Sequence, residues 1–123
     1  MRRHLLLAAV SASLCACATT SNSIYQWGSY DNALYASYKD PNQVEALRVK
    51  LETLIADREK AGQKVAPGLY AELGTIYLQS GAADKASAMY AKEKDAWPES
   101  KTLMDAMIKN IERRKVASAG AKS

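Results

Sequence analysis

The segment "PGLYAELGTIYLQSGAADKASAMYAKEKDAWPES", residues 67–100, decides the fold of this chain of 123 residues. Its apolar residues recur at helical spacing on both sides of Gly81, whose permissive backbone suits the end of a helix. Gly74 and Ala86 lack bulk, so two helices can cross closely where these residues meet. Aromatic side chains are available to fill the space on either side of that crossing: Tyr70, Tyr77 and Tyr90. The segment therefore predicts a hairpin of two helices.

The same residues resemble one tetratricopeptide repeat, a helical hairpin of about 34 residues. The positions that carry the resemblance, all interpreted as structural, are Tyr70, Leu73, Gly74, Tyr77, Gly81, Ala86, Tyr90 and Pro98. Pro98 falls where such repeats leave their second helix, and proline stops a helix. Glu93 departs from the pattern, because a small alanine is usual at its position. One such hairpin cannot bury its apolar face alone, so neighbouring helices are required.

Three further helices are expected beside the repeat. Helical spacing predicts a helix over residues 42–61, with an apolar face formed by Val44, Leu47, Leu51, Leu54 and Ile55. After the repeat, a C-terminal capping helix is predicted from the stripe Leu103, Met104, Met107, Ile108 and Ile111. A short helix over residues 31–39 would pair with the 42–61 helix and bury Leu34, Tyr35 and Tyr38. The expected fold class is all-α, with tetratricopeptide-like hairpins over residues 31–116 and a disordered tail over residues 117–123.

The first 17 residues, MRRHLLLAAVSASLCAC, have the composition of an export signal. A basic start precedes an apolar run over residues 5–14 that is too short to span a bilayer, and small residues follow. The ending resembles a bacterial lipobox, which Cys17 fits and Cys15 does not, since the bulky Leu14 directly precedes Cys15. The prediction is a signal peptide over residues 1–16 and a covalent lipid on Cys17, followed by a polar tether over residues 18–23. The alternative is a plain signal peptide with incidental cysteines.

Cleavage before Cys17 removes the only histidine and leaves about 107 residues, enough for one small domain. The net charge falls from +4 to about +2, which does not call for nucleic acid. With the remaining cysteine acylated, no side chain is left for thiol, imidazole or zinc chemistry. Glu45 and Glu52 lie two turns apart among basic residues, which is typical of a solvated face. We therefore expect no enzyme, no metal site and no cofactor other than the lipid.

The segment "YQWGSYDNALYASY", residues 25–38, holds four of the seven tyrosines and one of the two tryptophans. Its first part has the pattern YxWGxY, formed by Tyr25, Trp27 and Tyr30, with Gly28 allowing a bend. These rings lie close to the predicted lipid and to the domain. Three locations remain open for them: against their own domain, against a protein partner, or in the membrane interface.

A second candidate surface follows from the repeat. Tetratricopeptide arrays usually bind peptides on the concave face formed by their first helices. The residues of this chain at the corresponding positions are Ala71, Thr75, Leu78 and Gln79. They are small and mostly uncharged, which argues against a clamp for a terminal carboxylate. The expected ligand is a helix or an extended segment held by shape and apolar contact.

The whole chain resembles a family of short bacterial lipoproteins of unknown function. The resemblance is carried by the lipobox at residues 14–17, "YQWGSY" from Tyr25, "LYASYKDP" from Leu34 and "GLYAELGTIYLQSG" from Gly68. Members tend to be encoded beside a lipoprotein similar to the curli-secretion pore component, which implies a cell-envelope assembly. The resemblance implies a non-catalytic scaffold or assembly factor, anchored in the outer membrane, facing the periplasm and contacting other envelope lipoproteins. The alternative is a protein that binds peptidoglycan or another glycan, with Trp27 stacking on sugar rings.

Overall fold

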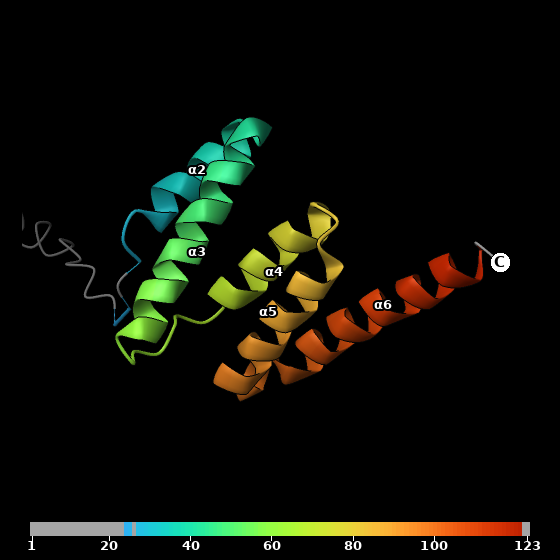
Figure 1. The fold of residues 1–123 in the computed structure, drawn as a ribbon. Helices are drawn as coiled ribbons and strands as arrows, with labels where there is room; N and C mark the ends of the chain where they lie inside the picture. Colours follow the sequence, from blue (N-terminus) through green and yellow to red (C-terminus); the bar gives the residue numbers. More distant parts are fainter. Residues whose placement is uncertain (1–23, 26, 122–123) are drawn as a thin grey trace, which may run out of the picture.

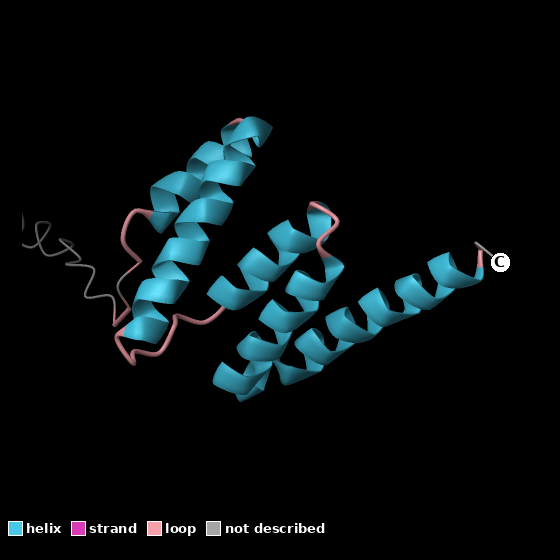
Figure 2. Ribbon diagram, viewed as in Figure 1, coloured by secondary structure: helices cyan, strands magenta, loops and turns pink. Residues whose placement is uncertain are grey.

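The computed structural model describes residues 24, 25 and 27–121, and within these residues the structure is helical, without β-strands (Figures 1 and 2). Five α-helices and two short 3-10 helices follow one another: α2 (Tyr30–Lys39), η2 (Pro41–Gln43), α3 (Val44–Lys60), α4 (Leu69–Gln79), α5 (Ala83–Ala96), η3 (Pro98–Ser100) and α6 (Lys101–Gly120). The predicted all-α class is confirmed. The predicted signal peptide, Cys17 and the polar tether lie outside the described residues. No helix of the described part is both long enough and apolar enough to cross a membrane.

Helices α2 and α3 pack side by side as the first pair (Figure 1). Asp40 separates them in an extended conformation, as expected for a residue before proline, and its carboxylate accepts a hydrogen bond from the Asn42 N–H at 3.0 Å. This cap starts η2, so the predicted 42–61 helix begins as a 3-10 turn and continues as α3. The buried face of α3 is the predicted one: Leu47, Leu51, Leu54 and Ile55.

Helices α4 and α5 form the second pair, and they approach each other closely at Gly74. A Cβ atom on Gly74 would lie 2.9 Å from the Tyr90 ring and 3.2 Å from the Ala86 carbonyl oxygen. Ala86 itself is fully buried. Gly81, in the turn between the helices, has φ = 83°, a conformation that residues with a side chain rarely adopt. The predicted helical hairpin and its crossing point are therefore present, whichever family the hairpin belongs to.

The hydrophobic core consists of two clusters. The first joins α3 to α4 and the loop between them through Leu47, Leu51, Leu54, Ile55, Val65, Ala66, Leu69, Tyr70, Leu73 and Ile76. The second joins α5 to α6 through Ala86, Tyr90, Met104 and Ile111. Helix α4 contributes to both, because Ala71, Tyr77 and Leu78 pack partly buried against the second cluster. The helices thus form a stack (Figure 1), in which α3 packs on α4 through the first cluster and α5 packs on α6 through the second.

Two expectations about burial were wrong. Tyr35 and Tyr38 are 62% and 80% exposed rather than buried, because α2 packs on the core through the partly buried Ala33 and Leu34. Leu103, placed on the buried stripe of α6, is 61% exposed, while Met104 and Ile111 are buried.

The predicted disordered tail is also partly wrong. Helix α6 continues to Gly120, and the Ala121 N–H still donates to the Ala117 carbonyl. The residues after Ile111 are all exposed as far as the structure describes them. Alanines in this stretch favour helix without any packing partner.

Candidate functional site

The aromatic residues before α2 form a chain of ring contacts with Trp97, which follows α5. Tyr25 meets Trp27 edge to face, with ring centroids 6.2 Å apart, and meets Trp97 in the same way at 5.9 Å. Trp27 stacks on Tyr30 with centroids 6.0 Å apart and ring planes 26° from parallel. We call these four residues the aromatic cluster. Tyr25, Trp27 and Tyr30 are half-buried and pack against the first hydrophobic cluster, so of the three locations left open, the rings occupy the one on their own domain.

Trp97 is held in place from the loop between α3 and α4. Its indole Nε1 donates to the Val65 carbonyl at 3.2 Å, and the Lys64 ammonium lies 3.5 Å from the centroid of its ring. Sequence reasoning missed Trp97 as part of this site. The only available signal was that it is the second of the two tryptophans, placed where the chain leaves α5.

Tyr30 connects the aromatic cluster to α4. Burial raises the pKa of its hydroxyl, and the nearby carboxylate of Glu72 raises it further. Gly28, with φ = 60°, makes the bend that brings Trp27 and Tyr30 together. The pattern YxWGxY is thus explained by local geometry: glycine turns the chain so that the rings on either side can stack.

Beside Tyr25 lies an open cleft of about 350 Å³, which we call the α3–α4 cleft. Its lining comes from the N-terminal segment, the end of α3, the following loop and the start of α4: Ile24, Tyr25, Leu54, Arg58, Gln63, Lys64, Ala66 and Leu69. Among the described residues of this lining, Arg58 and Lys64 carry cationic side chains and none carries a carboxylate.

The predicted concave-face residues belong to a different part of the molecule. Ala71 and Leu78 are half-buried against the second hydrophobic cluster, beside Met107 and Ile108 of α6. The Thr75 hydroxyl donates to the Ala71 carbonyl at 3.0 Å and lies 3.1 Å from the Tyr90 hydroxyl, while Gln79 is exposed. The two predicted surfaces, around Trp27 and around Thr75, therefore pack on separate clusters.

The repeat-pattern residues occupy structural positions. Tyr70, Leu73, Gly74, Ala86 and Tyr90 are buried. Tyr77 is half-buried, Gly81 lies in the turn, and Pro98 begins η3 directly after α5. No ligand-facing role is needed to account for these side chains.

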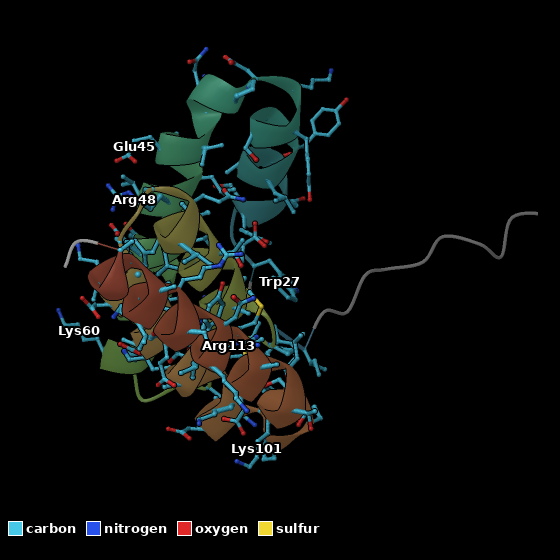
Figure 3. The ribbon with its side chains drawn as sticks, turned by 90° about the vertical axis from the view of Figure 1, so that its right-hand side faces the viewer. Trp27, Glu45, Arg48, Lys60, Lys101 and Arg113 are labelled. Carbon is cyan, nitrogen blue, oxygen red and sulfur yellow. The ribbon has the colours of Figure 1, made fainter. Side chains whose placement is uncertain are left out.

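A polar network joins α3 to α4 at a second cleft, of about 430 Å³. Arg48 forms ion pairs with Glu45 and Glu52, and the Tyr77 hydroxyl donates to Glu52. The hydrogen bonds that Arg48 donates to Glu45 and to Glu52 raise the pKa of Arg48, and burial followed by the hydrogen bond to Glu52 raises the pKa of Tyr77. Glu45 and Glu52 therefore both bind the guanidinium of one arginine. Figure 3 shows Glu45 and Arg48 on the side of the molecule opposite Trp27.

Glu93 is the buried carboxylate of the described part, with 3% of its surface exposed. Its Oε1 accepts the Gly68 N–H at 2.8 Å, so it caps the start of α4 from α5. Its Oε2 has no hydrogen-bond partner among the described residues. The glutamate that departs from the repeat pattern thus has a structural contact of its own.

Within the described residues, no three His, Cys, Asp or Glu side chains gather closely enough to hold a metal ion. No curated protein sequence and no solved structure shows significant similarity to the chain. One family model, described as "Domain of unknown function (DUF4810)", matches residues 24–107, from the aromatic segment to the first half of α6. The chain therefore belongs to the DUF4810 family of domains of unknown function.

Proposed function

We propose that the protein is a lipoprotein anchored through Cys17 in the outer membrane, which acts in the periplasm as a non-catalytic scaffold of an envelope complex. The lipobox and the polar tether after it support the anchor. The close helix crossing at Gly74 supports a tetratricopeptide-like hairpin, a unit that commonly serves protein–protein contacts. The partners we expect are other envelope lipoproteins, including one similar to the curli-secretion pore component.

The observation that carries the proposal is the exposed face of α2. Tyr35 and Tyr38 lie three residues apart, so both project from one side of the helix, and both are mostly exposed. The Lys39 ammonium lies 4.7 Å from the centroid of the Tyr35 ring. Tyrosines are enriched in interfaces because a large, rigid, amphipathic ring buries much area at little entropic cost. These two residues replace Trp27 and Tyr30, which are engaged within the domain, as the main candidates for partner contact.

A photo-crosslinking amino acid at position 38 of the lipidated protein, in the native envelope, tests the proposal. We expect one envelope protein to be captured from position 38 and not from position 102, since Thr102 is exposed on α6, a helix that lies apart from α2 (Figure 1). The variant Tyr35→Ser with Tyr38→Ser should abolish co-purification of that protein without changing the melting temperature. Capture of the same proteins from both positions would contradict a specific contact through α2.

The alternative function, glycan binding, predicts a different result. The protein would then be retained on isolated peptidoglycan, and Trp27→Ala would remove that retention while the tyrosine double variant would not. Trp27 contacts the rings of Tyr25 and Tyr30 in the same segment, and this intramolecular stacking competes with a sugar for the indole. The structure therefore favours the protein scaffold over the glycan binder as the proposal to test first.

A further inference from the structure

We infer that one exposed stripe of α6 binds an acidic α-helix of a partner protein, and that this partner differs from the protein contacted by α2. The inference rests on the scaffold part of the proposed function and adds to it a second contact surface with a stated partner chemistry. It does not depend on the lipid anchor.

The first argument is the pattern of residues on α6. Met104 and Ile111 hold the helix on the second hydrophobic cluster. On a different side of the helix, positions separated alternately by three and four residues form the stripe: Leu103, Ala106, Asn110, Arg113 and Ala117. All of them except the half-buried Asn110 are exposed, and Leu103 has 61% of its surface exposed. This spacing is that of the seam along which two α-helices pack, and the small alanines permit a close approach.

The second argument is the charge beside the stripe. In the seven-residue repeat that the stripe defines, Lys109 and Arg114 occupy the flanking positions, where opposite charges on the facing helix select the partner. Within the described residues, Lys109, Arg113 and Arg114 form no ion pair. Lys115, outside the stripe, pairs with Asp84 of α5. The cations along the stripe therefore suit carboxylates on a partner helix.

The third argument concerns two simpler explanations of these cations. Basic side chains stabilise the C-terminal end of a helix through its dipole, but this effect fades within the last turn. The last turn of α6 holds no basic residue, so the dipole does not account for Lys109, Arg113 or Arg114. Residues 106–121 carry four basic side chains and one acidic side chain, so the same stripe of a second copy would be repelled.

The fourth argument is the accessibility of α6. The helix extends away from α3 and α4 toward its C-terminal end (Figure 1), and the described residues after Ile111 are all exposed. In Figure 3, α6 lies nearest the viewer and Arg113 is labelled on it. A second helix can therefore lie along this part of α6 without displacing a helix of the domain.

Binding of a designed peptide tests the inference on the full-length protein in a non-ionic detergent. The probe is a helix of about three heptads, with leucine at the seam positions and glutamate at the flanking positions. A second peptide has lysine in place of glutamate, and a third has the composition of the first in scrambled order. We expect fluorescence anisotropy to detect binding of the first peptide alone, and this binding should weaken at high salt.

Two double variants locate the binding site. Lys109→Gln with Arg114→Gln removes both flanking cations and should weaken binding of the glutamate peptide about fivefold, the effect of two exposed ion pairs. Lys101→Gln with Lys115→Gln makes the same change in net charge on α6 outside the stripe and should leave the affinity unchanged. All four side chains are exposed, so both variants should keep the melting temperature of the parent. Equal binding of the scrambled peptide, or equal weakening by the two double variants, would overturn the inference.

Photo-crosslinking in the native envelope tests the chemistry of the partner. From a crosslinking amino acid at position 106, we expect mass spectrometry to identify one linked protein segment that is acidic. The double variant of Lys109 and Arg114 should lose this product. A linked lipid, nucleic acid, second copy or non-acidic segment, or no product at all, would overturn the inference and leave the crosslink from position 38 unaffected. Loss of the crosslink from position 38 alone would instead remove the α2 contact of the proposed scaffold.

Discussion

Glu93 stands where the repeat pattern has a small side chain, and in the structure its carboxylate makes a specific hydrogen bond. Glu93 reaches from α5 to the Gly68 N–H, one of the amide groups that the start of α4 leaves without a partner inside the helix. A negative charge at a helix N-terminus is also favourable because of the helix dipole. One residue therefore ties the two helices of the hairpin together at their junction with the α3–α4 loop.

The substitution Glu93→Ala measures this cap. It removes the acceptor for the Gly68 N–H and leaves space in a buried site, so the free energy of unfolding should fall by about 1 to 2 kcal/mol. Glu93→Gln keeps an acceptor oxygen and should lose less. Urea denaturation of the three proteins gives the comparison. An alanine variant as stable as the parent would mean that the hydrogen bond between the Gly68 N–H and Glu93 adds no measurable stability.

The crossing of α4 and α5 makes a second prediction at the residue scale. Ala86→Leu would add bulk at a fully buried position beside Gly74 and cost about 1 to 3 kcal/mol of stability through overpacking. Lys85→Leu, at the neighbouring exposed position, should cost little. Thermal melts followed by circular dichroism distinguish the two. Similar melting temperatures would show that the crossing is looser than the contact at Gly74 indicates.

At the scale of elements, the segment before α2 behaves as part of the domain rather than as a free tether. Its rings reach from α2 to the end of α5 through Trp97, and Trp97 is fixed to the α3–α4 loop. Residues distant in sequence therefore close one end of the helical stack. The family model also begins at residue 24, which agrees with counting this segment as part of the domain.

Trp27→Ala tests whether this segment stabilises the fold. The half-buried indole loses its contacts with Tyr25 and Tyr30, so we expect a loss of about 2 kcal/mol, less than for a fully buried tryptophan. Tyr38→Ala removes a neighbouring ring that is 80% exposed and should stay within about 0.5 kcal/mol of the parent. If Trp27→Ala left the stability unchanged, the aromatic cluster would not contribute to the stability of the fold. Trp27 would then again be a candidate for partner contact.

At the scale of the whole molecule, Glu59 links three helices by polar contacts. Its carboxylate accepts the Tyr70 hydroxyl of α4 at 2.8 Å and pairs with Lys92 of α5 at 2.7 Å. The Lys92 bond and then the Tyr70 bond hold the pKa of Glu59 below its ordinary value of 4.5, and burial opposes them. The ionised form is thus favoured in the folded protein. Similar bonds from Lys94 and Lys101 lower the pKa of Asp105 in α6.

These shifts fix the direction of the pH dependence. A carboxylate whose folded pKa is lowered stabilises the fold above its unfolded pKa, and this contribution disappears as the pH falls through the folded pKa. The parent should therefore be more stable than Glu59→Gln at neutral pH, and the difference should shrink as the pH falls below about 4.5. Lys92→Gln removes the larger cause and should flatten the same part of the curve. Melting temperatures measured from neutral to acidic pH show the effect. A constant difference across that range would contradict the assigned role of Glu59.

The sequence by itself determined what depends on local spacing. The apolar repeat of α3, the small residues at positions 74 and 86, and the glycine between the helices sufficed for the all-α class and for the hairpin. Each of these features acts over one or two helical turns, so the types and spacing of neighbouring residues are enough to predict its effect. The sequence leaves three locations open for the YxWGxY rings, because spacing along the chain says nothing about what a ring will touch.

Only the tertiary structure decided which faces find partners. Helical spacing places Tyr35 and Tyr38 with Leu34, but in the packing of α2 on α3 Leu34 is partly buried and both tyrosines are exposed. The contact of Tyr25 with Trp97 joins positions 72 residues apart in the sequence, and Glu93 meets Gly68 across 25 residues. Burial of a given side chain depends on which helix packs against it. That neighbour is set by the summed fit of many apolar contacts, which the pattern of a single helix does not contain.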